Sequence, residues 1–203
     1  TARRLGITPI GVYADSDAEG AHLADVDFAM ALGDEGGESP YLDIEKVIAV
    51  ARCAGADAIH PGYGFLAENA EFAEACEANG IIWVGPPPAA MGAMAGKISA
   101  KEIAREAGVP VLDSIRLGDD LAPVHELAER VGLPLLIKPS AGGGGKGMHR
   151  VDSLEDLETE IAVARREALS SFGDATLFVE RYVERSRHVE VQVFGDMHGA
   201  VIH

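Results

Sequence analysis

Residues 138–148 read Lys-Pro-Ser-Ala-Gly-Gly-Gly-Gly-Lys-Gly-Met. The apolar runs on either side, 134–138 and 148–151, have the length and composition of short strands. Glycines permit positive φ and close backbone approach, so successive amides of the loop can point at one anion while the two lysines add positive charge. A flexible linker would not be bracketed by two strands and two lysines. We therefore predict a glycine loop that closes a β-hairpin over phosphate groups.

Two familiar phosphate-binding motifs do not describe this loop. A Walker loop requires Gly-Lys followed by Ser or Thr, whereas Gly147 follows Lys146. The spacing of Gly142, Gly144 and Gly147 matches the dinucleotide pattern GxGxxG, as almost any glycine run does. That pattern must open a helix, and the residues after Gly147 predict a strand. A hairpin loop remains the better interpretation.

Beyond the loop, Ser153 and Asp156 resemble a capping box that opens an amphipathic helix ending near Gly173. Strands are predicted over 176–183 and 188–194. In the second of these, alternate valines point to one face and polar side chains to the other, and residues 195–199 can turn the chain back. The second half of the chain is thus expected to be an α+β layer with antiparallel hairpins.

Before the loop, short apolar runs alternate with helical repeats, which predicts a parallel sheet covered by helices. Strands are expected over 9–14, 28–32, 58–60 and 81–84, and helices over 43–54, 69–79, 97–107 and 123–131. Asp43 and Asn69 are predicted to cap the first two helices, because their side chains can accept from the free amides of a first turn.

A domain boundary is expected at Gly85-Pro86-Pro87-Pro88, where three prolines remove three donors and stop any helix. The charge changes near the same place. Residues 1–96 hold 4 basic and 15 acidic side chains, and residues 97–203 hold 13 and 18. The cations therefore gather in the half that contains the glycine loop.

Composition excludes several classes of protein. Of 203 residues, 47% are hydrophobic and 25% charged, as in an ordinary globular protein, and no apolar run has the ~20 residues of a membrane helix. The net charge of −16 opposes general nucleic-acid binding. Cys53 and Cys76 are expected to be buried, reduced thiols, which favours a cytoplasmic location. Both ends look cut, so a longer parent protein is expected.

Three further motifs accompany the glycine loop: His-Pro-Gly-Tyr-Gly-Phe-Leu-Ala-Glu-Asn at 60–69, Val-Glu-Arg-Tyr-Val at 179–183 and Arg-His-Val-Glu at 187–190. Together they resemble the biotin carboxylase family across the whole chain. The resemblance implies an α/β fold, with a Rossmann-like parallel-sheet amino-terminal (pre-ATP-grasp) domain over 1–92. The first part of an α+β ATP-grasp domain would follow over 93–203, with its glycine-rich lid over 111–183.

The same resemblance implies a set of ATP-binding residues. Lys97 and Lys138 match lysines that hold the phosphates, and the loop supplies further phosphate contacts. Residues 180–183 match a hinge that reads adenine through backbone groups, with Glu180 receiving its amino group. The implied set is Lys97, Lys138, Gly142, Gly143, Gly144, Gly145, Lys146, Gly147, Met148, Glu180, Arg181, Tyr182, Val183 and His188. Catalytic and metal-binding residues are expected past His203, and none within this chain.

The implied reaction is a ligase reaction: ATP activates bicarbonate to carboxyphosphate, which carboxylates biotin on a carrier protein. ATP, Mg²⁺, bicarbonate and carrier-linked biotin are the implied cofactors and substrates. A biotin carboxyl carrier, a carboxyltransferase component and a second copy of the chain are the implied partners, with no nucleic acid and no membrane. The final acceptor, an acyl-CoA, pyruvate or urea, stays open.

Three alternatives remain. Another ATP-grasp ligase, such as a carbamoyl-phosphate synthetase or a purine-pathway enzyme, would share the phosphate loop but use another acceptor. A non-catalytic nucleotide-sensing module would bind without turnover, and a Rossmann oxidoreductase would prefer NAD to ADP. We expect residues 1–203 alone to lack biotin-dependent ATPase activity.

Overall fold

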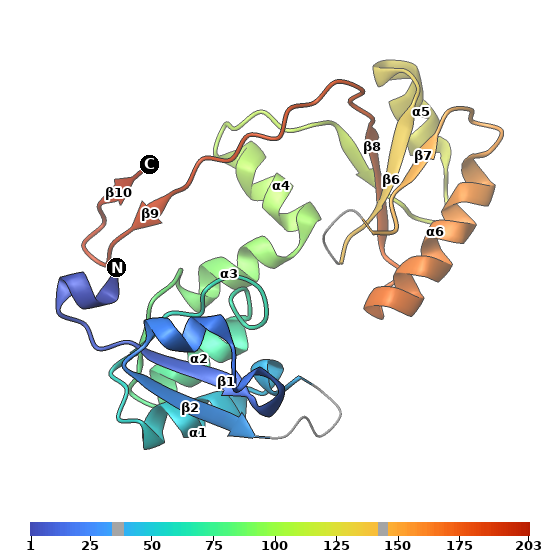
Figure 1. The fold of residues 1–203 in the computed structure, drawn as a ribbon. Helices are drawn as coiled ribbons and strands as arrows, with labels where there is room; N and C mark the ends of the chain where they lie inside the picture. Colours follow the sequence, from blue (N-terminus) through green and yellow to red (C-terminus); the bar gives the residue numbers. More distant parts are fainter. Residues whose placement is uncertain (34–38, 142–145) are drawn as a thin grey trace. The chain divides into compact units, whose positions relative to one another are not determined.

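Parallel strand pairs and covering helices make up the first ninety residues, as the alternating sequence pattern predicts. The structure is a computed structural model that describes residues 1–33, 39–141 and 146–203. It divides into two compact units, Thr1–Gly92 and Ala93–His203 (Figure 1). In chain order the first unit contains η1 (Ala2–Leu5), β1 (Ile10–Ala14), η2 (Asp15–Asp17), η3 (Ala21–Asp25), β2 (Phe28–Gly33), η4 (Pro40–Leu42), α1 (Ile44–Cys53), β3 (Ala58–Ile59), α2 (Ala70–Ala78) and β4 (Ile82–Trp83).

Strand β1 pairs in parallel with β2, and β3 pairs in parallel with β4. The core of this unit lies between α1, α2 and the second strand pair, where Ile48, Phe72 and Cys76 are buried. The Phe72 ring packs edge-on against Trp83, with the ring centroids 5.5 Å apart. Both predicted caps are confirmed: Asp43 accepts from the Lys46 amide at 3.0 Å and Asn69 accepts from the Phe72 amide at 2.8 Å.

An antiparallel sheet forms the centre of the second unit. Helix α3 (Pro88–Ala95) crosses the boundary, and the elements after it are α4 (Lys97–Glu106), β5 (Ser114–Arg116), α5 (Ala122–Val131), β6 (Leu135–Pro139), β7 (His149–Val151), α6 (Leu157–Phe172), β8 (Leu177–Arg181), β9 (Phe194–Gly195) and β10 (Val201–Ile202). Four strands pair in the order β5-β8-β6-β7, all antiparallel. The predicted hairpin is confirmed, because β6 and β7 are adjacent and antiparallel on either side of the glycine loop.

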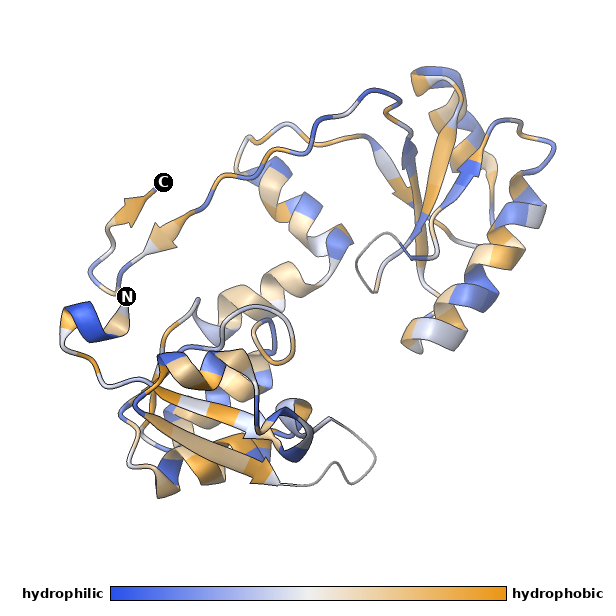
Figure 2. Cartoon of the chain, viewed as in Figure 1, coloured by the Kyte–Doolittle hydropathy of each residue, from blue (hydrophilic) through white to orange (hydrophobic). Residues whose placement is uncertain are grey.

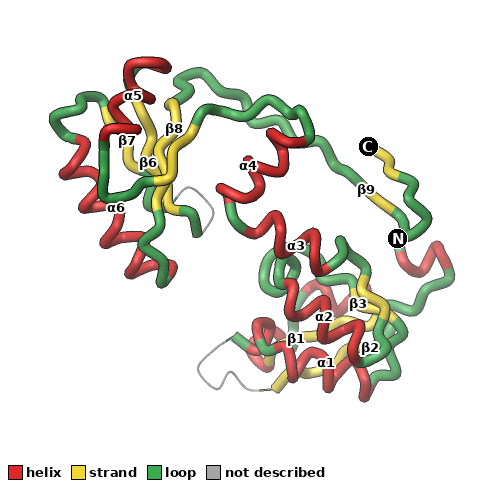
Figure 3. The backbone as a smooth tube through the Cα atoms, turned by 180° about the vertical axis from the view of Figure 1, so that it is seen from behind, coloured by secondary structure: helices red, strands yellow, loops and turns green. Residues whose placement is uncertain are grey.

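One face of this sheet carries the main core. Figure 3 shows α5 and α6 beside strands β6, β7 and β8. Alternate residues of β6, Leu135 and Ile137, are fully buried in a cluster that also contains Leu127 of α5 and Ile161 of α6. Figure 2 shows hydrophilic and hydrophobic residues alternating along α6, which is consistent with a helix that buries one side. The period of two along a strand leaves Leu136 and Lys138 on the opposite face.

Three sequence predictions are wrong. Residues 188–193 pair with no strand among those the structure describes, and their valines are exposed, because alternation cannot form a ladder without a neighbouring strand. The hairpin that does form joins β9 to β10.

The predicted capping box of α6 is absent. Helix α6 begins after Asp156, whose side chain makes no cap bond, while Ser153 Oγ accepts from the Glu155 amide. Of the two thiols, Cys76 is buried but Cys53 is exposed.

Among the described parts of the chain, no helix combines the length and the apolar character needed to cross a membrane.

Candidate functional site

Two lysines one turn apart open α4. Lys97 is the first residue of the helix and Lys101 follows four positions later, so both ammonium groups lie on the same side of the helix. The Lys97 ammonium donates to the Pro139 carbonyl at 3.3 Å, at the end of β6 where the glycine loop begins. The Lys101 ammonium lies 5.3 Å from the centroid of the Phe178 ring. Helix α4 therefore brings two cations to the face of the sheet opposite the core formed with α5 and α6.

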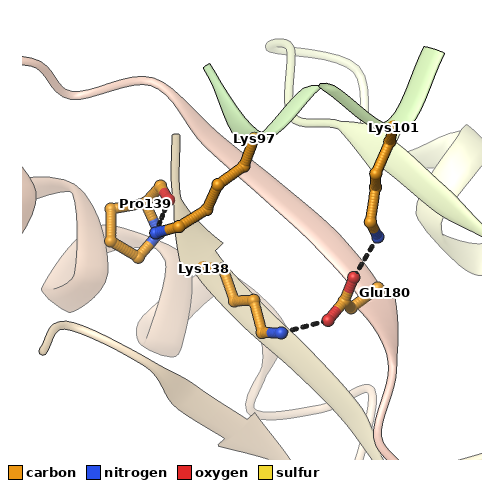
Figure 4. A network of polar contacts seen from close by, with 5 residues as sticks. All are labelled: Lys97, Lys101, Lys138, Pro139 and Glu180. Atoms are coloured by element: carbon orange, nitrogen blue, oxygen red, sulfur yellow. Dashed lines mark hydrogen bonds and ion pairs between the residues drawn. The ribbon is translucent and has the colours of Figure 1, made fainter. Parts of the chain in front are cut away.

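Strands β6 and β8 supply the rest of the cluster. Leu136 is opposite Glu180 in the register and Lys138 is opposite Phe178, which makes Lys138 and Glu180 diagonal neighbours on one face. The Glu180 carboxylate accepts from Lys138 through Oε1 and from Lys101 through Oε2 (Figure 4). We call Lys97, Lys101, Lys138 and Glu180 the lysine cluster.

Burial and charge set the protonation states of this cluster. Glu180 is only 3% exposed, and burial by itself raises the pKa of its carboxyl group. The hydrogen bonds and charges of Lys101 and Lys138 outweigh burial and hold that pKa below its ordinary value. Burial, and then the charge of Lys138, lower the pKa of the Lys97 ammonium. One ionised carboxylate thus faces three lysines, and the surplus positive charge suits an anionic ligand.

The loop beside the cluster is described in part. Gly142, Gly143, Gly144 and Gly145 lie outside the described residues. Gly147 has φ +71°, a conformation that favours glycine, and lies close to the Pro139 ring. Lys146 and Met148 are exposed, Met148 by 46%. One described end of the loop therefore continues from β6, the strand that carries Lys138, and the other end leads into β7.

Residues 181–183 continue from Glu180 at the end of β8. The Tyr182 amide donates to the Pro134 carbonyl at 3.1 Å, and the Arg150 guanidinium lies 4.9 Å from the centroid of the Tyr182 ring. Arg181 and Val183 are exposed. The four predicted hinge residues are thus contiguous with the lysine cluster through the backbone of one strand.

His188 is not brought to the lysine cluster by any contact that the structure describes. Its imidazole is 81% exposed and its Nε2 lies 2.8 Å from Glu190 Oε1. Lys101, in contrast, belongs to the cluster and is absent from the predicted set. In the sequence, the four-residue spacing between Lys97 and Lys101 indicated that the two side chains share one side of a helix. Only the fold shows that Glu180 lies next to Lys101.

A second polar cluster ties the hairpin to α6. His149 on β7 has Nδ1 2.9 Å from Glu160 and Nε2 2.9 Å from Glu167. Burial lowers the pKa of the imidazole, but the hydrogen bonds and charges of the two glutamates outweigh it and raise the pKa above its ordinary value. The protonated form donates from both ring nitrogens, so it bridges the strand and the helix.

This bridge predicts a pH-dependent contribution to stability. Because the folded pKa of His149 is raised, the contribution is complete below the unfolded value of about 6.5 and is lost as the pH rises through the folded pKa. We expect His149→Gln to lower the free energy of unfolding by about 1 kcal/mol at pH 6 and by less at pH 9. Urea unfolding of both proteins at the two pH values measures this. An equal difference at both would contradict the charged bridge.

Across residues 1–33, 39–141 and 146–203, no group of three His, Cys, Asp or Glu side chains is arranged to hold a metal ion.

Family models match both units. The model for the amino-terminal domain of biotin carboxylase matches residues 1–91. The model for the ATP-binding domain of the carbamoyl-phosphate synthase L chain matches residues 96–203. The two matches therefore account for nearly the whole chain.

Similarity to individual proteins also extends over both units. The alpha subunit of mitochondrial methylcrotonoyl-CoA carboxylase from Oryza sativa subsp. japonica is 46% identical over 100% of this chain and 28% of its own length. A crystal structure of the biotin carboxylase–β,γ-ATP complex from Campylobacter jejuni has a TM-score of 0.89 and 41% identity, covering 99% of this chain and 45% of that one.

A third relative is the biotin carboxylase domain of the 2-oxoglutarate carboxylase of Hydrogenobacter thermophilus. It was solved as a dimer with MgADP, ADP and bicarbonate, and it has a TM-score of 0.88 and 37% identity over 100% of this chain and 45% of its own. The present chain thus spans less than half the length of each of these relatives. The model for the first unit and the three relatives, which cover both units, lead to one assignment: the chain belongs to the biotin carboxylase family.

Proposed function

We propose that the protein containing this chain carboxylates biotin on a carrier protein, using ATP and bicarbonate by way of carboxyphosphate. Within it, residues 1–92 would form the amino-terminal domain and residues 93–203 the first part of the ATP-grasp domain, with its lid over 111–183. The chain spans 28% to 45% of the relatives described above, so the reaction is proposed for the longer protein.

The observation that carries the proposal is the surplus of positive charge where β6 meets the glycine loop. Lys101 and Lys138 pair with one carboxylate, Lys97 contacts the Pro139 carbonyl, and the loop follows directly after Pro139. Phosphoryl transfer depends mainly on positioning and on neutralising charge, which these groups would supply to a nucleoside triphosphate. The Campylobacter and Hydrogenobacter relatives were solved with adenine nucleotides, which supports the same ligand class.

We propose that the ATP-binding residues predicted from the sequence form the nucleotide site, and that Lys101 contributes to this site indirectly. Lys97 and Lys138 would hold phosphates, residues 142–148 would cover them, and residues 180–183 would read adenine through backbone groups. His188 stays in the set as a proposal, although its described contact is with Glu190. Mg²⁺, bicarbonate and biotin would be bound by parts of the protein outside residues 1–203.

The remaining assignments follow from the same proposal. A biotin carboxyl carrier, a carboxyltransferase component and a second copy of the protein would be the partners. The Hydrogenobacter relative was solved as a dimer, which supports the last of these. We propose a cytoplasmic location on the basis of the two free thiols, and cell fractionation would test it, since the rice relative is mitochondrial.

ATP hydrolysis by the full-length protein in bicarbonate, with and without free biotin, tests the reaction. We expect biotin to stimulate hydrolysis. If ADP binds but biotin and bicarbonate change nothing, the reaction belongs to a different ATP-grasp ligase or to a nucleotide sensor. The carbamoyl-phosphate synthase model that matches residues 96–203 keeps the first of these as the second candidate. Tighter binding of NAD than of ADP would contradict both.

A further inference from the structure

Lys101 and Lys97 have different partners although they share one side of α4. Lys97 contacts a backbone carbonyl at the start of the glycine loop, whereas Lys101 contacts the Glu180 carboxylate. The Lys101 side chain is 22% exposed and lies over Phe178, a ring that is itself only 2% exposed. Packing against this ring limits where the ammonium group can go, so its contact with Glu180 is held by apolar packing as well as by charge.

The Glu180 carboxylate is shared between two cations, one on each oxygen. A carboxylate paired with Lys138 alone would form a neutral pair and would compete with any anion for that ammonium group. With Lys101 on the other oxygen, the three groups carry one net positive charge. Lys101 thus offsets the charge of Glu180 and leaves the charge of Lys138 available to a ligand.

We propose that Lys101 is a positioning residue for the nucleotide phosphates: it neutralises and orients Glu180, so that Lys138 can bind an anionic phosphate instead of closing a neutral pair. This inference rests on the proposed nucleotide site and deepens it. The depressed pKa of the Glu180 carboxyl group is consistent with this role, since both lysines contribute to it.

Three substitutions in the full-length protein test the proposal by calorimetric titration with ADP and with adenosine. Lys101→Met keeps the stem over Phe178 and removes the charge. We expect it to weaken ADP about 5- to 10-fold and adenosine less than twofold, because adenosine has no phosphate. Lys101→Arg should restore most of the ADP affinity. Arg105→Met removes a cation from an exposed position of the same helix and should change ADP affinity less than twofold.

A double-mutant cycle separates an indirect role from a direct one. If Lys101 acts by offsetting Glu180, then Lys101→Met should have less than a twofold effect on ADP in a Glu180→Gln background. A full effect in that background would mean that Lys101 contacts the ligand itself, and equal weakening of ADP and adenosine would mean a merely structural role. Either result overturns the proposal, as does an unchanged ADP affinity in the single variant.

Failure of the role proposed for Lys101 can be distinguished from failure of the proposed carboxylation reaction. The inference requires ADP binding but not biotin-stimulated hydrolysis. A wild-type protein that binds ADP, responds to Lys101→Met as expected and ignores biotin would retain the role of Lys101 and lose the carboxylase assignment. A wild-type protein that does not bind ADP would overturn both.

Discussion

Lys138→Ala is expected to weaken ADP binding by about 10- to 100-fold, the effect of losing a charge-assisted contact to a phosphate. Lys138 lies on β6, the strand that leads into the glycine loop, and its ammonium group bonds to the buried Glu180 carboxylate (Figure 4). Removing the Lys138 ammonium group also leaves Glu180 paired with Lys101 alone. These two side chains then form a neutral ion pair, so the local surplus of positive charge falls further.

Isothermal titration of the full-length protein with ADP measures this change. Arg130→Ala is the matched control, because Arg130 is a 59% exposed cation of the same unit that pairs with Asp113 at 3.4 Å. Its ADP affinity should stay within twofold of the wild type. Urea unfolding of the Lys138 variant shows whether the protein still folds. An unchanged ADP affinity in a folded variant would remove Lys138 from the proposed site.

Leu135→Ala is expected to lower the free energy of unfolding of the second unit by about 2–5 kcal/mol, the usual cost of truncating a buried leucine. Leu135 is 0% exposed, lies in the central strand β6 and packs within the cluster formed with α5 and α6. The other members of this cluster come from α5, β7, α6 and β8 and cannot all collapse into the space left by the lost methyl groups.

Leu169→Ala is the control for this prediction, since Leu169 is 58% exposed on α6, and it should cost less than about 1 kcal/mol. Because the chain contains two units, one unfolding curve can mix two transitions. Amide hydrogen exchange of β6 and β8 therefore accompanies urea unfolding and assigns the loss to the second unit. Equal losses for the two leucines would contradict the observed core.

The sequence alone predicted the features that depend on near neighbours. The caps at Asp43 and Asn69 each join residues three positions apart, so local order suffices to define them. The hairpin around the glycine loop, the strand that follows the loop and the end of α6 at Gly173 were predictable for the same reason. The family motifs likewise lie in continuous segments of the chain.

Features that join distant residues required the tertiary structure. The bonds from Lys138 and Lys101 to Glu180 span 42 and 79 positions, and they depend on the strand order β5-β8-β6-β7 and on where α4 lies. Residues 188–193 failed as a strand because alternation specifies which side chains share a face but not whether a neighbouring strand exists. Local hydrogen bonds are fixed by adjacent residues, whereas the charge balance at Glu180 is fixed by which segments the fold brings together.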